Sequence, residues 1–320
     1  MRLPAEIQAA IDKMTPQSEK ELIARAKALS LRYREETGRG ERLLSDDTDA
    51  LVYAHSRMPA TYAAALSVMK SIRERMDARP KTMLDAGAGT GSAALAAASV
   101  FDLSSAVCLE RESAMLKVGK ALCPSAIWQL QDLRDRIDCE SAEMVISAYA
   151  LGEMTGEDRI AAAKRLYAKA LKYLVIIEPG TPKGAESIKE VRSALAGLGA
   201  HIIAPCPSGG ACPLENGEWC AFSARVERMR LHRLMKGGDA PYEDEKFCYI
   251  CFSREEAPEG AVSRVLRHPY IEKGRITVRL CEKGGVKDRI ITKKENAAFK
   301  AARKCEAGDD LNAGARYQEL

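Results

Sequence analysis

The 320-residue sequence has no apolar run that approaches the roughly 18 residues a membrane-spanning helix needs. Its first residues also lack the apolar stretch of a secretory signal, and residues 1–20 mix acids with bases, unlike a mitochondrial transit peptide. These absences predict a chain with neither a membrane anchor nor a cleaved leader. We therefore expect a bacterial cytoplasmic protein that is monomeric when free.

Disulfides are the second feature that we expect to be missing. The chain has ten cysteines, but in the absence of an export signal a reducing compartment keeps thiols free. Clustered free thiols are more typical of a metal ion or an iron-sulfur cluster.

The periodicity of apolar residues predicts an α/β protein. Residues 5–78 have helical periodicity, and strands alternate with helices from Lys81 onward. This alternation predicts a doubly wound, Rossmann-like parallel sheet. Its expected strands are 82–85, 105–110, 144–148 and 173–178, with an antiparallel edge pair at 221–226 and 247–252 and a separate hairpin at 275–280 and 287–292.

A glycine-rich turn at residues 84–91 follows the first expected strand and precedes an Ala-rich helix. Gly87, Gly89 and Gly91 alternate after Asp85, so backbone can approach a bound nucleoside closely. This spacing differs from the Gly-x-Gly-x-x-Gly of dinucleotide sites and resembles motif I of class I S-adenosylmethionine-dependent methyltransferases.

Three side chains should meet this turn at the carboxyl ends of neighbouring strands. Glu110 is placed to accept hydrogen bonds from ribose hydroxyls, and Asp132 could contact the adenine edge. Ser147 ends the third expected strand. The segment at 145–153 lacks the Asn/Asp-Pro-Pro-Tyr motif of amino-methylating enzymes, and we assign no catalytic residue.

Three cysteines, Cys206, Cys212 and Cys220, lie in the Pro- and Gly-rich loop 203–220. Thiolates are soft metal ligands, and the wide gaps and Cys-Pro dipeptides favour an iron-sulfur cluster over structural zinc, which remains the alternative. A fourth ligand could be Cys248, Cys251 or Cys281, of which we choose Cys281 because it ends the 275–280 strand. His201 and His232 are more remote candidates.

Residues 261–305 carry 13 Lys/Arg against four Asp/Glu, which leaves the rest of the chain near −5. This excess could neutralise several phosphates, although a solvated basic face is the alternative. Few aromatics accompany the charge, so backbone or shape recognition of folded RNA is favoured over base stacking. The basic side chains expected to share this surface are Arg275, Arg279, Lys283, Lys287, Arg289, Lys293 and Lys294.

Six ordered segments together resemble the methyltransferase-like assembly factors of the mitochondrial ribosomal small subunit and their bacterial relatives. The segments are residues 57–62, 84–91, 177–184, 206–214, 219–220 and 242–247. The resemblance implies S-adenosylmethionine binding, a 4Fe-4S cluster on Cys206, Cys212, Cys220 and Cys281, and action on small-subunit ribosomal RNA. Cys248 stands where that family usually has Ser.

Two functions remain open at this point. One is an S-adenosylmethionine-dependent methyltransferase that acts on small-subunit ribosomal RNA or the assembling subunit, with the cluster as a structural or sensory element. The other is a catalytically silent assembly factor that uses the fold as an RNA-binding platform. The expected organisation is a helical region at 1–78, a methyltransferase-like domain at 79–256, a basic β extension at 257–305 and a tail at 306–320.

Overall fold

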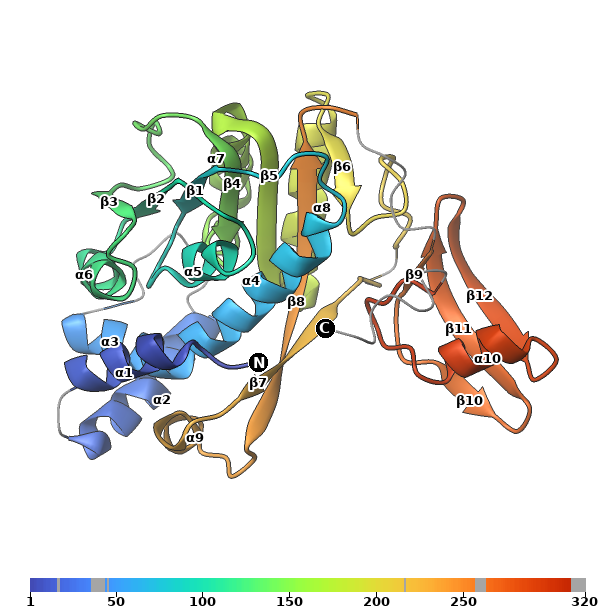
Figure 1. Ribbon diagram of the computed structural model, residues 1–320, viewed down its shortest axis with the longest axis horizontal. Helices are drawn as coiled ribbons and strands as arrows, with labels where there is room; N and C mark the ends of the chain where they lie inside the picture. The colour runs from blue at the N-terminus through green and yellow to red at the C-terminus, as the bar shows by residue number, and fades with distance from the viewer. Residues whose placement is uncertain (16–17, 36–43, 45, 216, 257–262, 312–320) are drawn as a thin grey trace.

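The computed structural model describes residues 1–15, 18–35, 44, 46–215, 217–256 and 263–311 (Figure 1). The expected boundary at 256/257 and most of the 306–320 tail therefore lie outside the described residues. None of the described helices is long and apolar enough to cross a bilayer.

Among the described residues, four helices precede the first strand. They lie beside one face of the main sheet (Figure 1). Pro59 stands in the first turn of the fourth helix, where its missing N–H is not needed. Asp46 caps the third helix by accepting a hydrogen bond from the backbone N–H of Asp49. The four helices are α1 (Ala5–Met14), α2 (Glu19–Glu35), α3 (Asp47–Ser56) and α4 (Met58–Arg73).

The main sheet has eight strands in the order β3-β2-β1-β4-β5-β8-β6, with β7 also paired to β8. Strands β1 to β5 run parallel, and β8 runs antiparallel to β5. This Rossmann-like order reverses direction along the sheet beside β1, so a ligand crevice is expected at the carboxyl ends of β1, β2 and β4. The strands are β1 (Thr82–Ala86), β2 (Ser105–Glu110), β3 (Ile127–Leu130), β4 (Ala142–Ala148), β5 (Ala170–Pro179), β6 (His201–Ala204), β7 (Phe222–Glu227) and β8 (Tyr242–Ser253).

Helices cover both faces of this sheet, as the doubly wound prediction requires (Figure 1). Alternate residues of β4 and β5 enter two separate cores: Met144 and Ile146 pack toward the N-terminal helices, and Val145 packs toward the other face. Burial on both sides explains the nearly continuous apolar runs of these strands. The helices after β1 are α5 (Ser92–Ala98), α6 (Ser113–Leu122), the 3-10 helix η1 (Leu151–Glu153), α7 (Gly156–Lys169), α8 (Pro182–Ala196) and α9 (Arg230–Lys236).

A second, four-stranded sheet stands beside the main sheet and contains the expected hairpin (Figure 1). Along β11, Ile276, Val278 and Leu280 are buried against the C-terminal helix. The alternate residues lie on the opposite, outward face, where Arg275 is exposed but Cys281 is buried. The elements are β9 (Ser263–Val265), β10 (Tyr270–Glu272), β11 (Arg275–Glu282), β12 (Gly285–Thr292) and α10 (Asn296–Ala302).

The structure confirms the parallel α/β sheet, the antiparallel strands β7 and β8, and the hairpin. It corrects one detail, because β8 is not an edge strand along its whole length. Its first half pairs with β7, while its second half lies between β5 and β6. The four-residue strand β6 was not expected, since so short a segment gives little periodicity.

Candidate cofactor pocket and cysteine centre

The glycine turn after β1 has the backbone conformation that its sequence indicates. Gly87, Gly89 and Gly91 have φ values of +74°, +56° and +85°, a region that side chains with a Cβ rarely adopt. At Gly87 space is also restricted, because a Cβ would lie 2.5 Å from the Cβ of Ala150. Gly91 ends the turn at the start of α5.

A cavity of about 70 Å³ opens at this turn and contains four of the seven predicted cofactor residues, Gly87, Gly89, Glu110 and Asp132. Asp85, Gly91 and Ser147 do not line it. Typical small-molecule sites measure about 300–1,000 Å³. The cavity is small partly because Tyr33 of α2 and Tyr53 of α3 form part of its wall.

Glu110 is buried at the end of β2 and braces the glycine turn. One carboxylate oxygen accepts from the backbone N–H of Gly89 at 2.7 Å, and the other accepts from that of Glu112 at 2.8 Å. Burial raises the pKa of Glu110, while these two N–H donors oppose the shift.

Asp85 and Ser147 are buried beneath the cavity at the ends of β1 and β4. Asp85 accepts from the backbone N–H of Ala94 at 3.0 Å, so it ties the strand to α5. Its second oxygen and the Ser147 hydroxyl have no hydrogen-bond partner among the described residues. Burial raises the pKa of Asp85 to about 7, against the opposing bond from Ala94.

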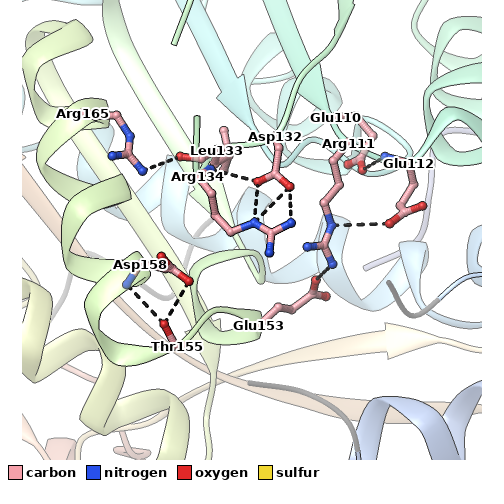
Figure 2. Close-up of polar contacts among 10 residues, drawn as sticks. All are labelled: Glu110, Arg111, Glu112, Asp132, Leu133, Arg134, Glu153, Thr155, Asp158 and Arg165. Atoms are coloured by element: carbon pink, nitrogen blue, oxygen red, sulfur yellow. Dashed lines mark hydrogen bonds and ion pairs between the residues drawn. The ribbon is translucent and has the colours of Figure 1, made fainter. Parts of the chain in front are cut away.

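Two arginines lie among the carboxylates around the cavity (Figure 2). Arg134 forms a bidentate pair with Asp132, and Arg111 approaches Glu153 at 3.4 Å. Burial raises the pKa of Glu153 to about 8, and the positive charge of Arg111 opposes that shift. Carboxyl groups therefore surround the cavity, and the two arginines together with the raised pKa values of Glu110 and Glu153 limit the negative charge there.

Sequence reasoning did not identify Tyr33, Tyr53, Tyr149 or Glu153 as lining residues. Tyr149 is the one non-glycine residue of positive φ in the described chain, at 59°, and its hydroxyl donates to Glu245 at 3.1 Å. Such a conformation is uncommon away from functional sites or turns. The position of Tyr149 just after β4 was the available signal, because loops at strand carboxyl ends line the crevice.

The cysteine centre is a second, smaller cavity of about 20 Å³. Cys206, Cys212 and Cys220 line it together with Cys281 of β11, so the structure brings the four predicted ligands to one place. Among the described residues, however, no three His, Cys, Asp or Glu side chains are arranged so that they could hold a metal ion. The thiols are thus neighbours that are not at coordination geometry.

Two buried arginines, Arg192 and Arg264, complete the lining of this second cavity. Arg192 donates to the sulfur of Cys206 at 2.7 Å and to the carbonyl of Ser208 at 3.0 Å. Arg264 donates to the carbonyl of Pro205 at 3.0 Å. Burial raises the pKa of the Cys220 thiol to about 12 and that of Cys281 to about 11, and the charge of Arg264 opposes both shifts.

The other candidate ligands lie elsewhere. Cys248 donates to the carbonyl of Pro179 at 3.3 Å and does not line the second cavity, although it is close enough to Cys220 for their charges to interact. Cys251 is buried in the core beneath the N-terminal helices. His201 is exposed on β6, and His232 is buried beside Glu243 at 3.3 Å.

Many cations of the predicted basic surface are paired with acids. Arg275 pairs with Glu272, Lys287 with Glu282, and Arg289 with Glu295. Arg279 binds both Asp288 and Glu218, and the second of these pairs connects the C-terminal sheet to the Cys-rich loop. The net excess of charge remains, but its free part is smaller than the count of Lys and Arg indicates.

The doubly wound sheet and its glycine turn define a protein with the Rossmann-like methyltransferase fold. A family model described as "Mitochondrial small ribosomal subunit Rsm22" matches residues 47–312, so the chain belongs to the Rsm22 family. This agrees with the resemblance seen in the sequence.

Two curated relatives are similar to the chain over most of its length. The human "Ribosome assembly protein METTL17, mitochondrial" is 25% identical over 291 residues, which cover 82% of this chain and 62% of the relative. "Rsm22-cox11 tandem protein 2, mitochondrial" of Schizosaccharomyces pombe is 26% identical over 326 residues, which cover 82% of this chain and 43% of the relative. The chain thus spans less than two thirds of each relative.

Among solved structures, magnesium protoporphyrin IX methyltransferase from Synechocystis PCC 6803 with bound SAM aligns at a TM-score of 0.42 and 13% identity. The alignment covers 70% of this chain and 90% of that one.

The expected bacterial cytoplasmic location is wrong by these comparisons. The family description and both relatives carry the word mitochondrial. Composition and free thiols could not have shown this, because they do not distinguish one reducing compartment from another.

Proposed function

We propose that the chain is an S-adenosylmethionine-dependent, methyltransferase-like protein that acts on the small ribosomal subunit or its RNA. The observation that carries the cofactor assignment is the first cavity, which lies at the positive-φ glycine turn and at the carboxyl ends of β1, β2 and β4. This is the place where a doubly wound sheet binds its ligand.

The residues at this cavity suit a cationic nucleoside. Gly87 and Gly89 let backbone approach it, and Glu110 is placed for ribose hydroxyls, with Asp132 toward the adenine edge. A sulfonium ion at the cavity would favour the ionised form of Glu110 and Glu153, so these carboxyl groups complement S-adenosylmethionine, which supplies an electrophilic methyl group when bound. Asp85 and Ser147 support this surface from beneath, and Gly91 sets the start of α5.

Binding requires the cavity to enlarge, because its present volume is below that of typical ligand sites. Tyr33 and Tyr53 are the side chains to move, since they reach the cavity from the N-terminal helices. Isothermal titration with S-adenosylmethionine tests this: Tyr33→Ala should retain or strengthen binding, whereas Glu110→Gln should weaken it. Equal affinity of wild type and Glu110→Gln would overturn the placement of the ribose.

We propose further that Cys206, Cys212, Cys220 and Cys281 hold a 4Fe-4S cluster. Four thiols around one cavity are a suitable donor set, and the two buried arginines beside them would offset the negative charge of four thiolates. The cluster supplies a rigid cross-link, and its ligands would join the Cys-rich loop to β11. Zinc remains the alternative occupant of the same thiols.

Anaerobic purification tests the cluster. The protein should absorb broadly near about 400 nm through thiolate-to-iron charge transfer, and Cys206→Ser or Cys281→Ser should lose that absorbance. Cys139→Ser is the matched control, because Cys139 is also half-buried but does not line the second cavity. A colourless, zinc-containing protein would overturn the iron assignment.

The ribosomal role rests on family membership and on the excess positive charge after residue 260. The chain spans only part of the length of both relatives, so its association with the small ribosomal subunit is part of the proposal. The test incubates the full chain with labelled S-adenosylmethionine and small subunits from a deletion strain. Label in the ribosomal RNA supports a methyltransferase, while binding without label leaves a catalytically silent assembly factor.

A further inference from the structure

The outward face of the C-terminal sheet carries an exposed apolar row that the sequence did not reveal. Register places Tyr270 of β10 opposite Thr277 of β11, and Thr277 opposite Ile290 of β12. Paired residues share one face of a sheet, so these three form a continuous row. Tyr270 is 66% and Ile290 58% exposed, so the row presents two large apolar side chains to solvent.

This row does not belong to the core of the sheet. The core lies on the opposite face, where Ile276 and Leu280 pack against α10. Two strand spacings, roughly 10 Å, separate Tyr270 from Ile290. That span gives room for two flat rings to lie against the row.

Positive charge lies beside this row, just beyond the ends of β10 and β12. Lys273 follows β10, and the backbone N–H of Lys293 donates to the carbonyl of Gly274 at 3.2 Å, so the two turns are adjacent. Lys273, Lys293 and Lys294 are exposed and form no ion pair with any described residue. They differ in this respect from Arg275 and Arg279, whose guanidinium groups already bind acids.

We propose that this outward face, defined by Tyr270, Thr277 and Ile290, binds unpaired bases of an RNA strand. Lys273, Lys293 and Lys294 hold phosphates of the same strand where it passes their end of the sheet. The inference rests on the proposed function and replaces the expectation that backbone contacts alone recognise the RNA.

Two properties of the face favour this occupant. Base stacking on an aromatic side chain contributes to single-strand binding whatever the sequence, and the three lysines can pair with phosphates of the same strand. A double helix has its bases stacked inside and offers none to Tyr270. An acidic protein segment would use the lysines without needing a flat, exposed tyrosine.

Fluorescence anisotropy on the full chain tests the proposal, with a labelled single-stranded RNA of about 12 nucleotides and a duplex of the same length. Tyr270→Ala should weaken single-strand binding about tenfold, the lower part of the usual range for one stacked base. Tyr270→Phe should restore it, because the ring remains. Tyr242→Ala is the matched control, since Tyr242 is 48% exposed but lies on β8.

A double variant, Lys293→Ala with Lys294→Ala, separates the two contributions. It should reduce the slope of log affinity against log salt by about 1 to 1.5, whereas Tyr270→Ala should leave that slope unchanged. If single and double strands bind equally and Tyr270→Ala has no effect, the base-binding face is overturned while RNA binding stands. If neither RNA binds but intact subunits do, a protein occupies the face and the RNA proposal fails as well.

Discussion

The guanidinium group of Arg192 donates to the sulfur of Cys206 at 2.7 Å and to two carbonyls of the same loop, those of Ser208 and Gly210. One buried side chain of α8 thus holds the Cys-rich loop against the methyltransferase-like sheet. Burial raises the pKa of the Cys206 thiol, and the positive charge of Arg192 opposes that shift.

Replacing Arg192 should therefore affect both stability and the cysteine centre. Arg192→Met removes the charged donor to the carbonyls of Ser208 and Gly210, so we expect the free energy of unfolding to fall by about 2 kcal/mol. Iron content after anaerobic reconstitution should fall as well, because a less favoured thiolate binds metal more weakly. Urea denaturation and iron analysis measure the two effects. Arg79→Met, at an exposed position, should change neither, and equal losses in both variants would contradict the role of Arg192.

The glycine turn allows a steric test. Gly87→Ala places a methyl group 2.5 Å from the Cβ of Ala150 in a backbone region that alanine avoids. We expect it to reduce S-adenosylmethionine affinity at least tenfold, by displacing the turn from the cavity. Gly156→Ala is the control, because no atom lies within 4 Å of its added methyl group. Unchanged affinity in Gly87→Ala, measured by calorimetry, would show that the cofactor lies elsewhere.

The sequence predicted the parallel sheet and the glycine turn because their signals are local. Residues 105–110 were expected as a strand and form β2 with the same bounds. Cys281 was singled out for its place at the end of a strand, and the structure puts it beside Cys206. These features depend on periodicity within a few residues.

Other features depend on contacts between distant segments and left no local pattern. Arg279 and Glu218 are 61 positions apart in the sequence, so their ion pair leaves no local pattern. From the sequence alone, Arg279 therefore counts as a free positive charge of the basic surface. Tyr33 reaches the cofactor cavity from the N-terminal helices. The three-residue strand β10, which brings Tyr270 to the outward face, is too short to show a period of two.

Asp85 should make stability fall as pH rises. Burial raises its pKa to about 7 from 3.8, so the folded state binds a proton that the unfolded state releases. The stability of the wild type should decrease between pH 4 and 7, by a total on the order of 3 kcal/mol. Asp85→Asn keeps an oxygen that accepts from the backbone N–H of Ala94 and removes the charge. The stability of this variant relative to wild type should therefore increase from pH 4 to pH 7.

Urea denaturation at pH 5 and pH 8 compares this variant with wild type. Asp102→Asn serves as the control, because Asp102 is almost fully exposed and its hydrogen bond with Lys81 lowers its pKa. A stability difference for Asp85→Asn that is the same at both pH values would mean that Asp85 is ionised throughout.

Glu243 should have the opposite dependence on pH. Burial opposes its ionisation, but the contact with His232 and the hydrogen bonds from Lys236 and Arg228 outweigh that effect and hold its pKa well below the usual 4.5. The stabilisation is therefore complete above about pH 4.5 and is lost as pH falls toward the lowered value. Glu243→Gln should cost about 3 kcal/mol at neutral pH, because it leaves partly buried cations without their counter-charge. The loss of stability in Glu243→Gln relative to wild type should be smaller at pH 3.5.

The neighbouring Asp244 supplies the control for this test. It pairs with Arg225 at 2.9 Å, but both side chains are largely exposed, so Asp244→Asn should cost less than about 1 kcal/mol. Both variants can be compared by urea denaturation at pH 7 and 3.5. Equal costs at pH 7 would show that water screens Glu243 as well as it screens Asp244. In that case the contact between α9 and β8 would not depend on the buried carboxylate.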